Sequence, residues 1–376
     1  MRFLGLFASW LLGLVFVFLF LLALFSRHWP ASALALAAAL LALPPVRSWA
    51  AHGWASRLPR WLPGLLIPLL FVLFVFVIFK GMGNKRSIYK TPEIRSRLMA
   101  IYDTRMEQWP VPYETRDIET EYGRVHVIIC GPADGPPLVL LHASAMSSWS
   151  WLYNVEGLAA RYRTYAVDTI GDAGKSVLAD ATRAPENGTD MARLYADILD
   201  KLGVERASFI GASQGGFIAT NMAILKPDRV DKLVLCGPMG YGGTNASVLR
   251  ILLTTMFPVK PLHASTLRWA FGDDPKVQEA VGEWFRLILE GVISRQPRPR
   301  VFSRAELSTL DLPVFLILGR RDGLVGHPRN SLSAAEAIRG LKVEILDTGH
   351  LVSAEKPEEF NRLVLEFLSG AGSVPK

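Results

Sequence analysis

The chain has 376 residues, half of them hydrophobic and a fifth charged, so it can hold two or three domains and is too apolar to be mainly disordered. Its net charge of +7 lies in one region, because nine Lys and Arg and no acidic residue precede Glu93. The rest of the chain contains the other 32 of the 41 basic residues and all 34 acidic residues, so it carries no excess of positive charge. This argues against a nucleic-acid-binding surface there.

Residues 1–80 contain two long uncharged segments, Phe3 to Phe25 (23 residues) and Trp61 to Phe79 (19 residues). About 20 apolar residues cross a bilayer as a helix. Between them, the shorter Ala31 to Leu43 fits a third span or a short buried helix equally well. A cleaved signal peptide is disfavoured for the first segment because its apolar core is too long. The sequence therefore predicts a transmembrane region of two or three helices.

Residues 81–110 are expected to form a linker and a lead-in helix. Four basic residues lie at or soon after the end of the second long segment: Lys80, Lys85, Arg86 and Lys90. Basic residues beside a span favour the cytoplasmic side, and Arg47, Arg57 and Arg60 before this segment compete with the denser cluster after it. We therefore expect an integral membrane protein, held in the lipid bilayer by residues 3–25 and 61–79, with its globular domain in the cytoplasm.

Residues 111–369 alternate short β-branched runs with helical stretches, which is typical of a mostly parallel sheet covered by helices on both faces. Eight strands are predicted: Asp117 to Glu121, Val125 to Cys130, Leu138 to Leu141, Arg163 to Val167, Ala207 to Ile210, Lys232 to Cys236, Val314 to Leu318 and Val343 to Leu346. The pattern predicts one α/β domain with an eight-stranded sheet.

Residues 239–311 interrupt this alternation with three expected helices and no convincing strand, so they are predicted to form a helical lid. The insertion is rich in large apolar side chains: Met256, Phe257, Trp269, Phe271, Trp284 and Phe285. Helix packing is the usual role of such residues, and we expect a minority of them to line an apolar substrate pocket.

The predicted strand Ala207 to Ile210 leads into Gly211-Ala212-Ser213-Gln214-Gly215 and then a helix, which is the context required of a G-x-S-x-G nucleophile elbow. Such a turn strains the serine backbone, and Gly211 and Gly215 leave space for close packing. Ser213 is the predicted nucleophile, and the backbone N–H of Gln214 is a predicted oxyanion donor.

A serine nucleophile needs a base and an acid that orients it, in the chain order Ser, Asp, His. Asp322 follows the predicted strand that ends at Leu318, and His350 follows the one that ends at Leu346. Parallel strands would bring both to the edge of the sheet where Ser213 lies. Asp347 is a rival acid, but it is too close in sequence to His350 to lie readily behind its ring.

The second oxyanion donor is expected from the loop after the third strand. We assign it to the backbone N–H of Ser144, with Ala145 as the next choice, and expect His142 to brace the loop through hydrogen bonds. Neither a metal nor a cofactor is expected, because the histidines lack metal-ligand spacing. Cys130 and Cys236 are too few for a disulfide framework.

Gly171-Asp172-Ala173-Gly174-Lys175-Ser176 invites comparison with a phosphate-binding loop. That motif requires glycine at position 169, where this chain has threonine. No helix is expected directly after Ser176, so the phosphate-loop reading fails.

Several motifs together resemble the α/β-hydrolase fold superfamily and, within it, bacterial serine carboxylesterases. They are the elbow, Asp168-Thr169-Ile170-Gly171-Asp172, the Ser147-Ser148 pair with Trp151 and Asn154, and Trp109-Pro110-Val111-Pro112-Tyr113. The resemblance runs from about Tyr89 to Leu368 and excludes the membrane region. One departure is Ala143, where the family usually has glycine.

The resemblance implies a serine hydrolase that cleaves small or medium apolar esters through an acyl-enzyme intermediate. Serine at 213 argues against the dehalogenases and epoxide hydrolases of this fold, which use aspartate there. Two other classes stay open. One keeps the triad for acyl transfer, thioester or C–C hydrolysis, or perhydrolysis without a cofactor, and the other is a non-catalytic ligand-binding protein.

Overall fold

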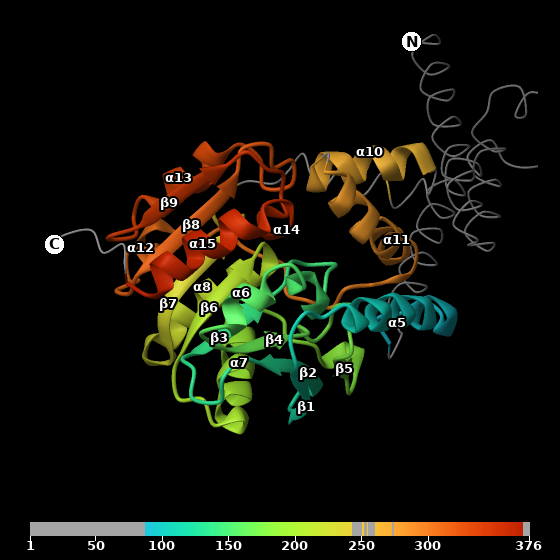
Figure 1. Cartoon of the computed structure of the whole chain (residues 1–376), viewed down its shortest axis with the longest axis horizontal. Coiled ribbons are helices and arrows are strands. Elements are labelled where there is room, and N and C mark those ends of the chain that lie inside the picture. Colours follow the sequence, from blue (N-terminus) through green and yellow to red (C-terminus); the bar gives the residue numbers. More distant parts are fainter. Residues whose placement is uncertain (1–86, 243–249, 252–253, 255–259, 273, 371–376) are drawn as a thin grey trace, which may run out of the picture. The chain divides into compact units, whose positions relative to one another are not determined.

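The computed structural model describes residues 87–242, 250–251, 254, 260–272 and 274–370 (Figure 1). Both predicted spans and the segment between them lie in residues 1–86, outside the described residues, so the membrane anchor stays a prediction. No helix of the described part is long and apolar enough to cross a bilayer. The chain divides into two units, Met1–Lys85 and Arg86–Lys376, and all described residues belong to the second.

One sheet organises the described residues, with strand order β1-β2-β4-β3-β6-β7-β8-β9 and the short β5 paired to β2. The strands are β1 (Tyr113–Thr120), β2 (Gly123–Cys130), β3 (Pro137–Leu141), β4 (Arg163–Val167), β5 (Val177–Leu178), β6 (Ala207–Ala212), β7 (Val230–Cys236), β8 (Val314–Gly319) and β9 (Lys342–Leu346). All eight predicted strands are present. The sheet has nine strands rather than eight, because two-residue β5 is too short to produce a pattern.

The sheet is mostly parallel, as predicted. β2 runs antiparallel to β1, β4 and β5, whereas β3, β4, β6, β7, β8 and β9 run parallel to one another. The carboxyl ends of these six strands therefore lie along one edge, where α/β proteins place their functional loops.

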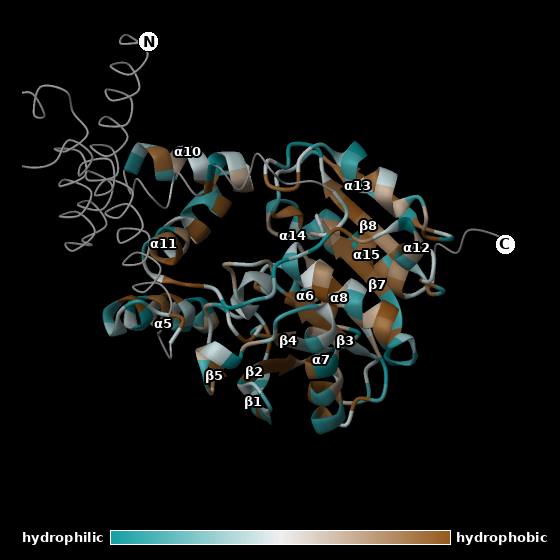
Figure 2. Ribbon diagram, turned by 180° about the vertical axis from the view of Figure 1, so that it is seen from behind, coloured by the Kyte–Doolittle hydropathy of each residue, from teal (hydrophilic) through white to brown (hydrophobic). Residues whose placement is uncertain are grey.

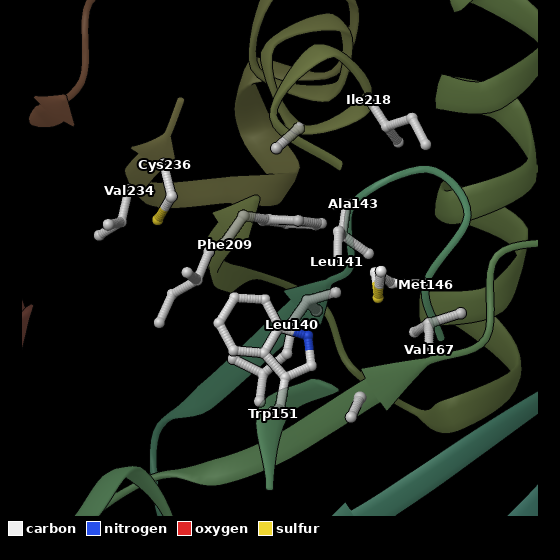
Figure 3. Packing of buried hydrophobic residues seen from close by; sticks show 14 of the residues in the cluster. Leu140, Leu141, Ala143, Met146, Trp151, Val167, Phe209, Ile218, Val234 and Cys236 are labelled. Carbon is white, nitrogen blue, oxygen red and sulfur yellow. The ribbon is translucent and has the colours of Figure 1, made fainter. Parts of the chain in front are cut away.

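The core lies on both faces of the central strands. Every residue of β8 is buried, which explains its continuous apolar sequence Val314-Phe315-Leu316-Ile317-Leu318, and its ribbon has the hydrophobic colour in Figure 2. Figure 3 shows Leu140 of β3, Phe209 of β6 and Val234 of β7 within this cluster.

Helices cover both faces of the sheet. The longer ones are α5 (Pro92–Glu107), α7 (Gly188–Leu202), α8 (Gln214–Leu225), α10 (Lys260–Phe271), α11 (Pro275–Gly291), α13 (Pro328–Ala335) and α15 (Pro357–Leu368); α6 (Val155–Ala159), α12 (Arg304–Leu307) and α14 (Val352–Glu355) are short. α6 packs with α15, and α7 packs with α8 (Figure 1). Asn187 caps the start of α7, because its side chain accepts the N–H groups of Thr189 and Asp190, and left-handed Gly203 follows its last residue.

The predicted helical insertion, residues 239–311, contains α10, α11 and α12 and no strand in its described part. Val292 makes an isolated bridge to Tyr89, just before α5. Lys90 donates its backbone N–H to the C=O of Gly291, and Arg97 of α5 forms an ion pair with Glu283 of α11. The lead-in segment and the insertion are therefore tied together.

Candidate active site

Ser213 occupies the turn between β6 and α8 and has φ 51°, which is the left-handed region that L residues avoid. Neighbouring strand ends hold this backbone in place. The Ser213 N–H donates to the C=O of Cys236 (2.9 Å), and the Ser213 C=O accepts the N–H of Met239 (3.0 Å). The strain expected of a nucleophile elbow is thus present at the predicted serine.

The two predicted elbow glycines lie where a side chain has no space. A Cβ on Gly215 would approach the backbone oxygen of Leu141 to 2.3 Å, and one on Gly211 would approach that of Gly215 to 2.5 Å. Contacts this short with backbone atoms require the chain to move. Glycine at both positions lets α8 start directly against β3 and β6.

Asp322 and His350 form a buried hydrogen-bonded pair. Asp322 follows β8 and His350 follows β9, so the parallel pairing of these strands brings the two loops together. Asp322 Oδ2 lies 2.7 Å from His350 Nδ1, and both side chains are almost fully buried. Asp322 Oδ1 accepts the N–H groups of Leu324 and Val325, which fixes the carboxylate plane.

This pair and the elbow meet at the carboxyl end of β7. Gly237 follows Cys236, the residue that accepts the Ser213 N–H. A Cβ on Gly237 would lie 3.2 Å from Asp322 Oδ2 and 3.3 Å from His350 Nδ1. The structure therefore places the serine, the histidine and the aspartate at the edge of the sheet where the sequence placed them.

The rival acid, Asp347, faces solvent. Its carboxylate lies 3.1 Å from Nε of Arg321, and its side chain is 64% exposed. Asp322 is thus the acid that contacts His350 Nδ1.

The two predicted oxyanion donors have N–H groups without an acceptor among the described residues. Gln214 is the first residue of α8, where a helix has no internal acceptor for its N–H. Ser144 is half-buried in the loop after β3. The side-chain amide of Gln214 donates to the C=O of Pro297, which ties the residues after α11 to the elbow.

Ala145, the next choice for an oxyanion donor, has its N–H engaged. It donates to Oδ2 of Asp172, a buried carboxylate in the loop after β4 (2.8 Å). Burial raises the pKa of Asp172, while the N–H groups of Ala145 and Ala173 oppose that rise. Sequence reasoning named Asp172 within a motif but gave it no role of its own, although an acid in the loop after a parallel strand was a signal for one.

His142 braces the loop, as expected. Its Nε2 accepts the N–H of Thr169, so Nδ1 carries the proton and donates to the C=O of Ala143 (2.8 Å). The ring joins the loops after β3 and β4, and it does not contact the Asp322–His350 pair through either nitrogen.

Glu355 is a residue that sequence reasoning missed. Its Oε2 accepts the N–H of Gly349, directly before His350, at 2.9 Å, and its Oε1 is buried without a partner among the described residues. Burial raises the pKa of Glu355 to about 6. Gly272, just after α10, lies against the same carboxylate.

The described apolar residues of the insertion pack partly on one another and partly on the rest of the domain. Phe271 and Phe285 meet edge to face at 5.1 Å, and fully buried Trp284 meets Trp149 in the same way at 5.5 Å. Trp269 lies against the backbone of Gly323. Met256 and Phe257 lie outside the described residues. In the described part, no group of three or more His, Cys, Asp and Glu could hold a metal ion.

The chain is similar to known hydrolases, both to a family and to individual relatives. Residues 136–257 match the family model described as alpha/beta hydrolase fold. Carboxylesterase YbfK of Bacillus subtilis (strain 168) is 31% identical over 292 residues, covering 73% of this chain and 94% of the relative. A 2-hydroxy-6-oxononadienedioate/2-hydroxy-6-oxononatrienedioate hydrolase of Burkholderia vietnamiensis is 29% identical, covering 65% and 91%.

Solved structures agree with these matches. Carboxylesterase CesB (YbfK) from Bacillus subtilis superposes with a TM-score of 0.66 at 30% identity, covering 74% of this chain and 99% of that one. Naproxen esterase from Bacillus subtilis gives 0.68 at 29% identity with the same coverage.

Proposed function

Because this chain belongs to the α/β-hydrolase fold family and is an ester hydrolase, we propose that it cleaves small or medium apolar esters through an acyl-enzyme intermediate on Ser213. The buried Asp322–His350 pair, which meets the nucleophile elbow at the end of β7, carries this proposal. The relatives named carboxylesterase and naproxen esterase support an ester as the substrate class.

In the proposed mechanism, Ser213 Oγ attacks the ester carbonyl while His350 Nε2 takes the hydroxyl proton. Asp322, bonded to Nδ1, keeps Nε2 free to act as the base and stabilises the imidazolium. The N–H groups of Ser144 and Gln214 stabilise the oxyanion. His350 then gives the proton to the leaving alcohol, and a water molecule, activated by the same histidine, releases the acid.

Probe labelling and ester turnover of the native enzyme and of the Ser213→Ala variant test the proposal. A fluorophosphonate probe should label native Ser213, and Ser213→Ala should lose the label together with at least ~10³-fold of the turnover on p-nitrophenyl esters. A series of acyl chain lengths then defines the preferred ester. Native turnover by the alanine variant would refute the proposal, and so would a native enzyme that neither labels nor turns over any ester of the series.

A C–C bond hydrolase is the second candidate, because the relative from Burkholderia vietnamiensis carries that type of name. The same triad would serve, so the substrate decides between the two. Turnover of a 2-hydroxy-6-oxo-dienoate that exceeds turnover of every ester in the series would favour the C–C reaction.

The uncharged segments at residues 3–25 and 61–79 support a further proposal, that the N-terminal quarter anchors the enzyme in a bilayer with the hydrolase domain in the cytoplasm. The full chain should stay in the membrane fraction after alkaline carbonate and leave it in detergent. A C-terminal green fluorescent protein fusion should fluoresce, whereas a C-terminal alkaline phosphatase fusion should be inactive. Release by carbonate would contradict the anchor, and an active phosphatase would contradict the orientation.

A further inference from the structure

The loop that carries Ser144 is a type II β-turn. The N–H of Met146 donates to the C=O of Ala143 at 3.0 Å, which closes the turn. Ala145, in its third position, has φ 65°, and Ser144, in its second, is not among the described residues with positive φ. A type II turn needs a positive φ at its third position, where glycine is preferred. Here an alanine takes the strained conformation, so contacts from elsewhere must stabilise it.

Both backbone polar groups of Ala145 are bound by side chains from distant elements. The N–H donates to Asp172 Oδ2 at 2.8 Å, and the C=O accepts Trp284 Nε1–H of α11 at 2.7 Å. Ala143 and Met146, at the ends of the turn, are buried in the hydrophobic cluster (Figure 3). The turn is therefore anchored at its ends by packing and at Ala145 by two hydrogen bonds.

The two side chains are themselves immobilised. Asp172 is almost fully buried, its Oδ1 accepts the N–H of Ala173 (2.9 Å), and its Oδ2 also accepts Nε2 of Gln296 (3.3 Å). Trp284 is fully buried with its ring at 80° to that of Trp149. Neither partner can follow the turn if the turn changes conformation.

The Asp172 contact selects between two turn conformations, and the Trp284 contact holds the next peptide, which carries the Ala145 C=O. Type I and type II turns differ by a reversal of the central peptide, which here joins Ser144 to Ala145. In the alternative type I turn the N–H of Ala145 would point away from Asp172, leaving a buried carboxylate oxygen without that donor. Reversal would also turn the Ser144 C=O toward that carboxylate, which is unfavourable. The Ser144 N–H lies in the preceding peptide, so its position depends on the turn staying where these contacts anchor it.

We propose that Asp172 and Trp284 are positioning residues, which anchor the turn in the place where it presents the Ser144 N–H to the oxyanion. This inference rests on the proposed function, because it takes Ser144 as the oxyanion donor. It adds two residues that touch no reacting atom to the determinants of catalysis.

Trp284→Phe tests the C=O side, because phenylalanine keeps a ring against Trp149 and removes the indole N–H. We expect kcat to fall about 10-fold with KM within about 2-fold, as a misplaced transition-state donor predicts. The readout specific to the oxyanion is a trifluoromethyl ketone, to which Ser213 Oγ adds reversibly, leaving the ketone oxygen as an oxyanion. Its Ki should rise by the same factor as kcat/KM falls.

Trp151→Phe is the matched control. Trp151 is also almost fully buried, and its indole N–H has no partner among the described residues. The control should leave kcat and the ketone Ki within about 2-fold of native, whatever it does to Tm.

Asp172→Asn independently tests the hydrogen bond to the Ala145 N–H. The inference can therefore be tested even if only one of the two variants folds. The carboxylate accepts N–H groups on both oxygens, and an amide must point its NH₂ at one of those donors. We expect the same parallel change in kcat/KM and ketone Ki. If a folded variant at either position keeps native kcat and Ki while Ser213→Ala is inactive, the positioning role of that residue is wrong and the proposed function stands. Native turnover by Ser213→Ala would instead overturn the proposed function.

Discussion

Asp322 Oδ2 lies 2.7 Å from His350 Nδ1, while Asp322 Oδ1 accepts two backbone N–H groups, from Leu324 and Val325. Because the two oxygens of Asp322 have different hydrogen-bond partners, the orientation of an asparagine amide at this position can be predicted. Two N–H donors keep one oxygen site as an acceptor, so the site that faces the histidine must take the NH₂.

Asp322→Asn should therefore fold and lose activity. The asparagine oxygen would stay with Leu324 and Val325, and its NH₂ would donate to His350 Nδ1. His350 would then carry its proton on Nε2, where it cannot accept one from Ser213. We expect kcat to fall about 10⁴-fold with Tm within a few degrees of native. A residual kcat above about a tenth of native would show that Asp322 does not set the tautomer.

The sequence could predict those parts of the site whose residues lie in a short, recognisable stretch of the chain. The turn around Ser213 combines a strand, two glycines and a helix within a dozen residues, and Asp322 and His350 each follow a recognisable strand. Parallel pairing then brings them to one edge without further information. The sheet was predictable for the same reason, with β5 too short to leave a pattern.

The contacts of Ala145 lacked any such signature. Trp284 lies 139 residues away and resembles any other apolar residue of an amphipathic helix. Asp172 stands in a glycine-rich turn that invited comparison with phosphate-binding loops. Their roles depend on hydrogen bonds between side chain and backbone across separate elements, which hydrophobic periodicity does not record.

Gly215→Ala tests the close packing at the elbow. The new Cβ would meet the backbone oxygen of Leu141 at 2.3 Å and that of His142 at 2.8 Å, so α8 must move away from β3. We expect a loss of about 3 kcal/mol in the free energy of unfolding, measured by urea denaturation with an unchanged m-value.

Gly282→Ala is its control, since a Cβ there would have one ordinary contact, with Leu267 at 3.6 Å. It lies inside α11, so alanine should raise the free energy of unfolding by about 0.5 to 1 kcal/mol. Equal effects at the two glycines would contradict the packing argument.

Backbone strain at Ala145 can be measured with a reciprocal pair of variants. Ala145→Gly removes a Cβ from a residue at φ 65°, and Gly203→Ala adds one at φ 72° where nothing lies within 4 Å. Relief of strain outweighs the greater entropy of the unfolded chain, so Ala145→Gly should stabilise, and Gly203→Ala destabilise, by about 0.5 to 1 kcal/mol. Calorimetry measures both, and destabilisation by Ala145→Gly would show that Ala145 is unstrained.

Glu355 should make stability depend on pH between about 4.5 and 6. Its folded pKa of about 6 lies above the ordinary 4.5, because burial disfavours the carboxylate. The folded state therefore binds the proton more tightly, so Glu355 adds stability below pH 4.5 and loses that contribution as pH rises through 6. Glu355→Gln removes the charge while keeping an oxygen for the N–H of Gly349. The variant should be more stable than native at pH 8, and its advantage should shrink as pH falls to 5.

Glu306→Gln is the control of opposite sign. The guanidinium of Arg300 and the backbone and hydroxyl of Ser303 lower the pKa of Glu306 to about 2, so its carboxylate stabilises the fold above about pH 4.5 and loses that contribution only as pH falls through 2. Between pH 8 and 5 Glu306 stays ionised in the folded chain and mostly ionised in the unfolded chain. Its glutamine variant should thus be slightly less stable than native by a constant amount, while the Glu355→Gln difference changes. The measurement is the difference in Tm between each variant and the native protein from pH 8 to pH 5. If this difference is as constant for Glu355→Gln as for the control, the pKa of the Glu355 carboxyl is not raised.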